Sequence, residues 1–353
     1  LPDRAQLQQL LREEVDRWKR RKRRNVKADQ HAIELLINHL VGLSYADARR
    51  LIRKVIYDDG AIDREDVQEV MDAKYRLLGG DGVLSYEADT AHLADVAGLD
   101  RMKHWLAQRE KVFTAARPPG GLDQPRGVLL LGVQGSGKSL AAKAVAGAWN
   151  VPLLRLDFAT LYNKYYGETE RNLREALRTA EAMAPCVLWI DEIEKGLATD
   201  QAEHAGPSRR MLGTLLTWMA ERTSRVFLVA TANDIDALPP ELLRKGRFDE
   251  IFFVDLPETQ VRENIFSIHL KQREQDVDSF DLAALARASE GFSGAEIEQA
   301  VVSALYSAYA SDSELETRHV LDELELTRPL SVVMAERIAA LRAWARTRTV
   351  SAN

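Results

Sequence analysis

The segment 132–139, GVQGSGKS, constrains the fold of this chain more than any other feature of the sequence. It follows an apolar run typical of a buried strand and precedes a segment with helical periodicity. Gly135 and Gly137 allow backbone N–H groups to turn toward an anion, and the N-terminus of the following helix favours the same anion. Lys138 can reach the β- and γ-phosphates of a nucleotide, and Ser139 can bind magnesium. The sequence therefore predicts a nucleotide phosphate site between a strand and a helix.

The region 93–257 alternates short apolar runs with helix-length segments. Runs of this length, bounded by turn signals, favour a parallel sheet that is buried between helices. We therefore expect a P-loop α/β domain with a parallel sheet of five strands. The five runs are GVLLLG, VPLLRLD, CVLWID, VFLVAT and EIFFVDL.

Polar residues end two of these runs. Asp191 and Glu192 follow CVLWI. Beside a phosphate loop, Asp191 can hold the magnesium shell, and Glu192 can orient or deprotonate the attacking water. Asn233 ends a further run and can hydrogen-bond the γ-phosphate and that water, although an Asn-Asp pair is also an ordinary turn. Together with the phosphate loop, these residues predict hydrolysis of a nucleoside triphosphate.

Helical patterns flank the α/β region on both sides, and a segment rich in glycine and acidic residues lies before it. Such a segment is typical of a linker. The expected divisions are an N-terminal helical region at 1–78, a linker at 79–92, a large α/β nucleotide-binding domain at 93–257 and a C-terminal helical lid domain at 258–353.

One internal similarity links the two helical regions. Residues 33–57 align with residues 282–306 without a gap, which pairs Gly42 with Gly291. If the similarity reflects a repeat, the N-terminal region is the lid of an earlier, degenerate ATPase module. The alternative is that two unrelated amphipathic helix pairs happen to match.

Composition restricts the class of protein. With 353 residues, 46% hydrophobic and 29% charged, the chain can form two or three domains with a sizeable core. A net charge of −6 argues against a protein that coats nucleic acid, although Lys19–Arg24 is a run of six basic residues. One cysteine and no long apolar segment suggest a reducing compartment such as the cytosol. Because the chain begins Leu1-Pro2 without methionine, we expect it to be a fragment of a longer protein.

These motifs together resemble the AAA ATPases of the substrate-remodelling clade over about residues 93–310. GVQGSGKS looks like the Walker A motif of that family, LWIDE like its Walker B motif, and Asn233 falls at its sensor-1 position. The segment DVAGLD, with Asp95 and Gly98, looks like the entry to its adenine pocket. The resemblance implies an ATPase that uses ATP and Mg²⁺, releases ADP and works as a hexameric ring.

The resemblance also implies further nucleotide contacts. SIHL places His269 where similar proteins contact the base and ribose, and GFSGAEIE, with Gly294 and Ala295, resembles the start of a lid helix that lines the pocket. A lone histidine is otherwise more often an ordinary surface or core residue. The remaining expected nucleotide contacts are Ser136 and Leu140 in the phosphate loop and the helix that it opens.

Two arginines match the arginine fingers of the family. Arg244 and Arg247 lie three residues apart in LLRKGRFD. Because the phosphate-loop lysine and magnesium already serve the subunit's own nucleotide, the arginines are suited to reach the γ-phosphate of a neighbour in a head-to-tail ring. The alternative is that Arg244 caps a helix C-terminus and Arg247 pairs with Asp249.

The segment NKYYGETE resembles a pore loop that contacts a threaded polypeptide. Tyr165 would be the pore aromatic and Lys164 its flanking cation. A second tyrosine, Tyr166, stands before the glycine, so the two tyrosines compete for this assignment. The alternative is an aromatic side chain that packs at the start of a helix.

Within this family the chain resembles the bacterial and plastid AAA proteins known as hypothetical chloroplast open-reading-frame proteins. LLLGVQGSGKS, MAPCVLWIDE and the late PLSVVMAERIAALRAWA carry this resemblance. The leading hypothesis is an ATP-driven ring motor that remodels or threads a protein substrate. A regulatory switch with little translocation is the alternative, and a nucleic-acid motor, suggested by Lys19–Arg24 alone, is less favoured. No H-E-x-x-H protease motif follows the ATPase region.

Overall fold

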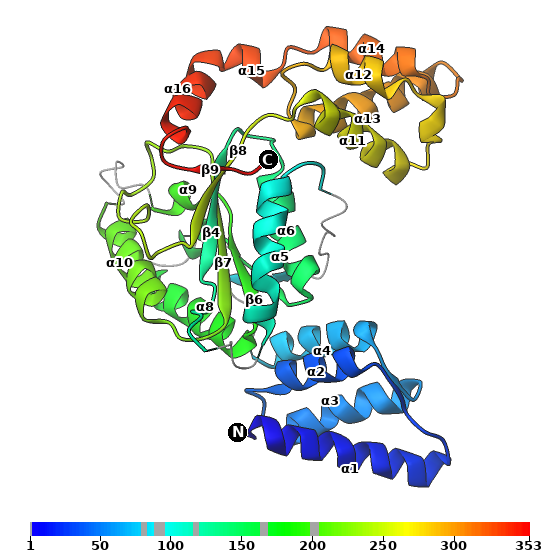
Figure 1. Cartoon of the computed structure of the whole chain (residues 1–353), viewed down its shortest axis with the longest axis vertical. Coiled ribbons are helices and arrows are strands. Elements are labelled where there is room, and N and C mark those ends of the chain that lie inside the picture. The colour runs from blue at the N-terminus through cyan, green and yellow to red at the C-terminus, as the bar shows by residue number, and fades with distance from the viewer. Residues whose placement is uncertain (1, 79–82, 88–95, 116–119, 163–168, 198–204) are drawn as a thin grey trace.

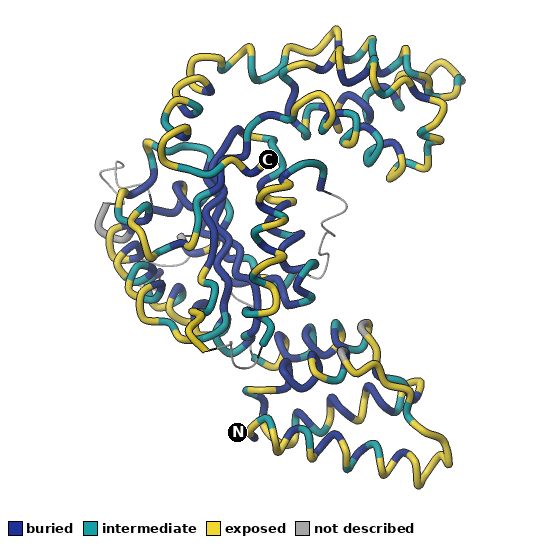
Figure 2. The backbone as a smooth tube through the Cα atoms, viewed as in Figure 1, coloured by how far each residue is buried: buried dark blue, intermediate teal, exposed yellow. Residues whose placement is uncertain are grey.

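The computed structural model describes residues 2–78, 83–87, 96–115, 120–162, 169–197 and 205–353. The molecule has three parts along its long axis: an N-terminal helical domain, a central α/β domain and a second helical domain (Figure 1). The strands of the central domain are the most deeply buried part of the backbone (Figure 2). This arrangement confirms the expected P-loop α/β class with helical additions at both ends.

In the described residues, the central sheet has seven strands in the order β3-β5-β6-β7-β4-β8-β9. The five expected strands form its parallel centre, from β5 to β8. Their apolar runs are buried on both faces, which is the burial expected of a parallel sheet covered by helices. The strands are β3 (Leu84–Glu87), β4 (Gly127–Gly132), β5 (Leu153–Leu156), β6 (Cys186–Ile190), β7 (Val226–Ala232), β8 (Glu250–Val254) and β9 (Val350–Ser351).

Two edge strands were not expected from the sequence. β3 lies in the segment 79–92 that was interpreted as a linker, and it pairs antiparallel with β5. β9 lies in the tail that was assigned to the lid domain, and it pairs parallel with β8. The sheet of five strands is therefore corrected to seven. Both additions are too short to give a periodic signal in the sequence.

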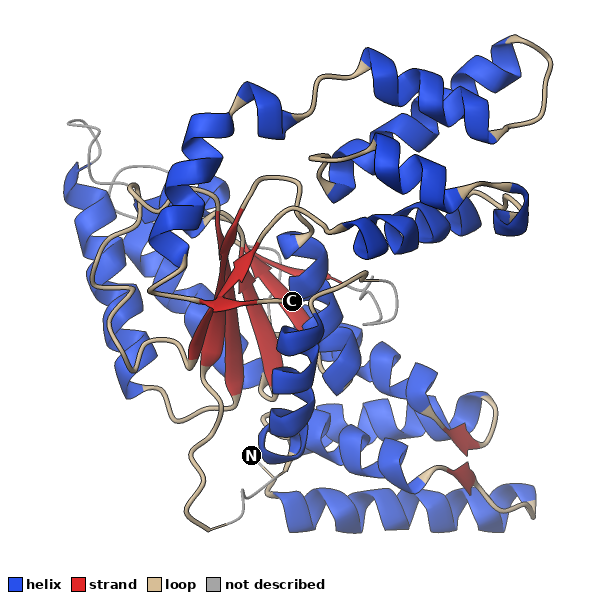
Figure 3. Cartoon of the chain, turned by 45° about the horizontal axis from the view of Figure 1, so that its top comes forward, coloured by secondary structure: helices blue, strands red, loops and turns tan. Residues whose placement is uncertain are grey.

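Helices cover the two faces of the sheet (Figure 3). Alternate residues of β4 point to opposite faces: Val128 and Leu130 pack with α5 and α6, whereas Leu129 and Leu131 pack on the side of α8 and α10. The helices of this domain are α5 (Asp100–Thr114), α6 (Lys138–Trp149), α7 (Phe158–Tyr162), α8 (Thr169–Met183), α9 (Ile193–Leu197) and α10 (Ala205–Glu221).

The second helical domain is shorter than the division at 258–353 supposes. Its separate core is formed by α11 to α14. After it, α15 and α16 return to the central domain, where Leu341 and Ala345 join the core beside the sheet. The elements are α11 (Thr259–Gln272), η2 (Val277–Ser279), α12 (Leu282–Ala288), α13 (Gly294–Ala310), α14 (Thr317–Leu326), α15 (Leu330–Val333) and α16 (Ala335–Ala345).

The N-terminal domain has its own apolar core and one small parallel pair of strands. Its turn before α3 has the same local geometry as the turn before α13: Gly42 and Gly291 have φ angles of +90° and +80°, and Ser44 and Ser293 cap the helices that follow. The elements are α1 (Arg4–Lys22), β1 (Lys27–Ala28), α2 (Gln30–Leu40), α3 (Tyr45–Asp58), β2 (Ala61–Ile62) and α4 (Arg64–Leu77).

The basic run begins in the last turn of α1, and its residues are exposed. Among the described residues, no helix combines the length and the apolar character needed to span a bilayer.

The close approach of β4 and β8 allows a test of the register in which these two strands pair. A Cβ atom at Gly132 would lie 2.0 Å from the carbonyl oxygen of Val254, and backbone cannot move aside as a flexible side chain can. We expect Gly132→Ala to lower the free energy of unfolding by at least about 3 kcal/mol, as severe overpacking does. Urea denaturation measures this loss.

Gly213→Ala is the matched control. Gly213 lies within α10, and an added Cβ would meet no atom within 4 Å. Because alanine favours a helix, this variant should gain about 0.5–1 kcal/mol. Equal stability of the two variants would contradict the register given for β4 and β8.

Candidate functional site

The phosphate loop connects the carboxyl end of β4 to the first turn of α6. Gly135 and Gly137 have φ angles of +76° and +92°, a left-handed conformation that glycine adopts without strain. A side chain at Gly135 would also collide with Ser293, because a Cβ there would lie 2.8 Å from the Ser293 Oγ. The loop therefore needs glycine at both positions, and at Gly135 also because the lid helix α13 lies against it.

Lys138, the first residue of α6, is buried under this loop. Its Nζ donates hydrogen bonds to the carbonyl oxygens of Gly132 and Val133 at 3.0 and 2.6 Å. Burial lowers the pKa of Lys138 to about 8, and nearby carboxylates, Glu194 foremost, oppose this shift. The backbone at the start of the phosphate loop thus holds the ammonium group in place. From there the ammonium group and the loop can bind a phosphate together.

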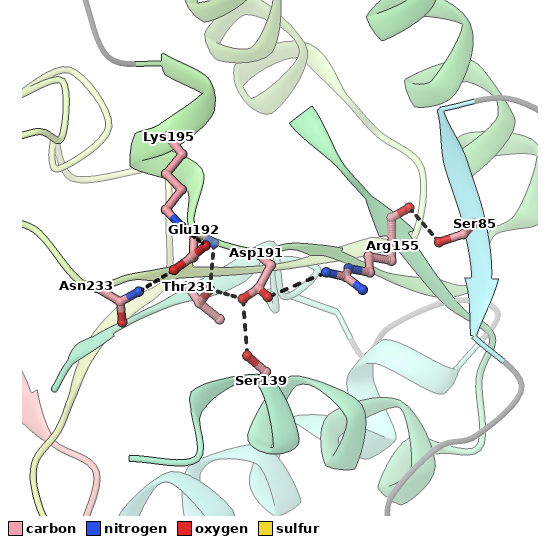
Figure 4. Close-up of polar contacts among 8 residues, drawn as sticks. All are labelled: Ser85, Ser139, Arg155, Asp191, Glu192, Lys195, Thr231 and Asn233. Atoms are coloured by element: carbon pink, nitrogen blue, oxygen red, sulfur yellow. Dashed lines mark hydrogen bonds and ion pairs between the residues drawn. The ribbon is translucent and has the colours of Figure 1, made fainter. Parts of the chain in front are cut away.

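Asp191 links the phosphate loop helix to two neighbouring strands (Figure 4). It follows β6, and its Oδ1 accepts hydrogen bonds from Ser139 Oγ at 3.2 Å and from Thr231 Oγ1 at 2.6 Å. Thr231 Oγ1 in turn accepts a hydrogen bond from the backbone N–H of Glu192 at 2.9 Å. The sequence interpretation did not single out Thr231; its position near the end of β7, two residues before Asn233, was the available signal.

Glu192 and Asn233 lie in direct contact. Asn233 Nδ2 donates to Glu192 Oε1 at 2.8 Å, and the ammonium of Lys195 lies against Glu192 Oε2 (Figure 4). Glu192 has a φ angle of +48°, a left-handed conformation that costs a non-glycine residue free energy. The fold thus holds this carboxylate in a strained and doubly restrained position.

Glu194 is a further acid that sequence reasoning missed. It is buried, and its Oε1 accepts a hydrogen bond from the backbone N–H of Asn233 at 2.9 Å. Burial is the largest cause that raises its pKa. Because it holds the backbone of Asn233, Glu194 fixes the end of β7 beside Glu192.

A cavity of about 770 Å³ opens between the central domain and the lid domain. His269 reaches it from α11, and Gly294 and Ala295 reach it from the start of α13. The backbone N–H of Ala295 donates to the carbonyl oxygen of Gly135 at 3.2 Å, so the lid helix touches the phosphate loop directly. Other expected residues that line the cavity are Gly135, Ser136, Gly137, Lys138, Ser139, Leu140, Asp191, Glu192 and Asn233.

His269 lines this cavity and has one buried ring nitrogen without a hydrogen bond in the described part of the chain. Among the described residues, its Nδ1 has no hydrogen-bond partner, and the nearest carboxylate oxygen, from Glu298, lies 3.8 Å away. Desolvation is the largest influence on its pKa and lowers it. The imidazole therefore borders the cavity while protein covers its Nδ1.

Gly98 lies just beyond the cavity. Its neighbours Val96 and Ala97 line the cavity, and a Cβ at Gly98 would lie 2.9 Å from the Asn353 Oδ1. Asp95 and the expected pore residues Lys164, Tyr165 and Tyr166 lie outside the described residues.

The two arginines are not part of this cavity wall. Arg244 is exposed in a turn, and the Arg247 guanidinium donates a hydrogen bond to the carbonyl oxygen of Leu216 in α10. Arg244 lies in a turn and not at the end of an α-helix, and Asp249 Oδ2 accepts from the backbone N–H groups of Arg126 and Gly127. In the described part of the chain, no ion pair joins Arg247 to Asp249.

The polar groups of this site suit magnesium better than they suit a metal ion whose ligands all come from the protein. Within the described ranges, no group of three or more His, Cys, Asp or Glu side chains could hold a metal ion. Magnesium in phosphate sites takes few protein ligands and completes its shell with phosphate oxygens and water. The Ser139 hydroxyl and the Asp191 carboxylate, 3.2 Å apart, suit that coordination.

Comparison with known families matches three parts of the chain. Residues 128–256 match the "ATPase family associated with various cellular activities (AAA)", and residues 279–323 match the "AAA+ lid domain". Residues 5–81 match the "SpoVK-like AAA ATPase, second domain". The last match covers the N-terminal helical domain.

Individual relatives extend the similarity to most of the chain. The uncharacterized AAA domain-containing protein ycf46 of Trieres chinensis is 40% identical over 323 residues, which cover 91% of this chain and 65% of the relative. Its counterpart in Guillardia theta is 40% identical over 318 residues, or 90% of this chain and 63% of the relative. The proteasome-activating nucleotidase of Aeropyrum pernix is 39% identical over 203 residues, 56% of this chain and 49% of the relative. The chain thus spans less than two thirds of the length of these proteins.

The lowered pKa of Lys138 generates a test of the phosphate site. Above pH 8 the free protein loses the Lys138 proton, and a bound phosphate anion raises the pKa again. Nucleotide binding should therefore take up a proton at pH 8.5 but not at pH 7, and ADP affinity should fall by up to about tenfold per pH unit above pH 8. Calorimetry in two buffers with different ionisation enthalpies measures the proton uptake.

Lys138→Arg is the control for this experiment. A guanidinium keeps its charge across this pH range, so the variant should bind without the additional proton uptake. Identical proton uptake by both proteins at pH 8.5 would assign the titration to another group.

Proposed function

Because the chain belongs to the AAA ATPases, we propose that it hydrolyses ATP to ADP and phosphate and works as a ring motor that remodels or threads a protein substrate. The observation that carries the hydrolysis is the cluster of Asp191, Glu192 and Asn233 at the edge of the cavity that contains the phosphate loop. An acid that is restrained by an amide beside a phosphate site is suited to activate water.

Each residue of the cluster has a distinct task in this proposal. Glu192 accepts a proton from the attacking water, and Asn233 and Lys195 orient its carboxylate. Lys138 and the N-terminus of α6 bind the phosphates. Ser139 and Asp191 hold magnesium, which when bound neutralises charge on the phosphate oxygens. His269, Gly294 and Ala295 contact the base and ribose from the lid.

The position of the arginines supports action between subunits. Arg244 and Arg247 lie outside the wall of the cavity in their own chain, and Arg244 is exposed. Such a pair can complete the site of a neighbour in a head-to-tail ring, and the usual ring of the family has six subunits. Arginine fingers of this kind contribute on the order of a thousandfold or more in rate.

The action on protein is supported by relatives named proteasome-activating nucleotidases, which share 38 to 39% identity with part of this chain. In this proposal Lys164 and Tyr165 or Tyr166 contact the polypeptide in the central pore. A bacterial cytosol or a plastid stroma is the proposed location.

Mixing two inactive variants tests action in trans. Glu192→Gln keeps its arginines but lacks the base, whereas Arg244→Ala keeps the base but lacks one finger. Each alone should lose at least about a hundredfold in ATP turnover, because each removes a group that acts only in the transition state. In a mixed ring, the Glu192→Gln subunit supplies Arg244 to its neighbour, so the mixture should regain turnover above either variant. A phosphate-release assay at varied mixing ratios measures this gain.

Arg244 is a better choice than Arg247 for the mixture, because Arg247 also holds α10 through the carbonyl oxygen of Leu216. Light scattering of Glu192→Gln in ATP provides the control for assembly and should give about six subunits. Assembled mixtures without regained turnover would contradict action in trans.

The pore residues separate a motor from a regulatory switch. A permanently unfolded model polypeptide should stimulate ATP hydrolysis severalfold, and Tyr165→Ala or Tyr166→Ala should abolish the stimulation while basal turnover stays unchanged. The variant that loses stimulation identifies the pore aromatic. Stimulation that survives both substitutions would favour the switch.

A further inference from the structure

Helices α15 and α16 connect the lid domain to the central domain (Figures 1 and 3). At the lid end, the backbone N–H of Leu330 donates to Glu296 Oε1 at 2.7 Å. The other oxygen of Glu296 accepts from the backbone N–H of Ser293 at 2.8 Å and completes the cap of α13. The start of α15 is therefore tied to the lid helix that touches the phosphate loop.

The apolar side of this segment lies on the phosphate loop. Ile338 of α16 is 6% exposed and forms a small core with Val133 and Leu256, and Leu330 and Met334 pack beside it. Val133 supplies one of the carbonyl oxygens that hold Lys138. A displacement of α16 would thus reach the loop through direct packing.

The polar side of α16 is bound to the ends of two strands. Arg342 Nε and Nη2 donate to both carboxylate oxygens of Asp255, just after β8, at 2.8 to 3.0 Å. Arg337 Nη2 lies 2.5 Å from the Asp234 Oδ2, just after β7. The other oxygen of Asp234 accepts from the backbone N–H of Asp236 at 3.0 Å and forms the turn.

Asp234 directly follows Asn233, the residue whose amide restrains Glu192. One carboxylate oxygen of Asp234 accepts a hydrogen bond within the turn, and the other binds Arg337 of α16. The turn after β7 is therefore held both by its own backbone and by α16. We propose that Arg337 is a positioning residue for ATP hydrolysis that acts through Asp234 on Asn233, and that it links the position of the lid to the orientation of Glu192. This inference rests on the proposed function.

The ion pair contributes little to stability. Arg337 and Asp234 are 57% and 32% exposed, and solvent screens pairs of this kind. Loss of the pair should therefore leave the fold intact. Its effect should be confined to the geometry of the turn and thus to the turnover of bound ATP.

A double-mutant cycle tests the inference. Arg337→Ala removes the guanidinium. Asp234→Asn removes the negative charge but keeps an Oδ1 that can accept from Asp236 N–H. Each single variant should lower kcat about fivefold with KM for ATP within about twofold, and the double variant should be no slower than either, because both remove one interaction. Arg337→Lys should retain part of the rate.

Arg346→Ala is the matched control, because Arg346 ends the same helix and is exposed. Its kcat should equal that of the wild type, and all variants should share the urea midpoint of the wild type. An active wild type with an unchanged kcat in Arg337→Ala, additive effects in the double variant, or a loss of kcat that follows a loss of stability would overturn this inference alone. A wild type without ATP hydrolysis would overturn the proposed function and the inference with it.

Discussion

The carboxylate of Asp191 is the interaction on which the arrangement of the site depends. It lies at the end of β6 and binds Ser139 of α6 and Thr231 of β7. Strand β7 lies between β6 and β4, and all three run in the same direction, so their carboxyl ends meet at one edge. One side chain can thus join the phosphate loop to the strand that positions Asn233. In an antiparallel sheet these ends would lie on opposite sides of the domain.

The residues at this centre carry local signals in the sequence. A motif of eight residues between an apolar run and a helical pattern indicates the phosphate site, and an acidic pair after an apolar run indicates the second strand. Thr231 and Glu194 were missed because neither residue type is unusual at its position. Their roles appear only when β6 and β7 lie side by side and bring Thr231 to Asp191 and Glu194 to Asn233.

The C-terminal end of the chain, in contrast, makes contacts that have no local signal in the sequence. Strand β9 has two residues, and its partner β8 lies about a hundred residues earlier, so no periodic pattern reveals the pairing. The tail also places Asn353 Oδ1 as an acceptor for the backbone N–H of Leu99, which begins α5 with a left-handed φ angle of +59°. Such contacts depend on the three-dimensional fold, and helical periodicity in α16 could not separate a lid helix from one that returns to the sheet.

The restraints around Glu192 are the point at which the lid, and in the proposed ring a neighbouring subunit, can influence the site. Its left-handed backbone costs free energy that the surrounding hydrogen bonds of Thr231, Asn233 and Lys195 offset. A carboxylate held this way changes its orientation when Asn233 moves. The lid reaches Asn233 through α16 in the same chain, whereas the arginines of the proposed neighbour approach the phosphates from outside. In the proposed function the lid acts on the carboxylate that activates water and the neighbour acts on the phosphates, so the turnover of one bound ATP depends on both.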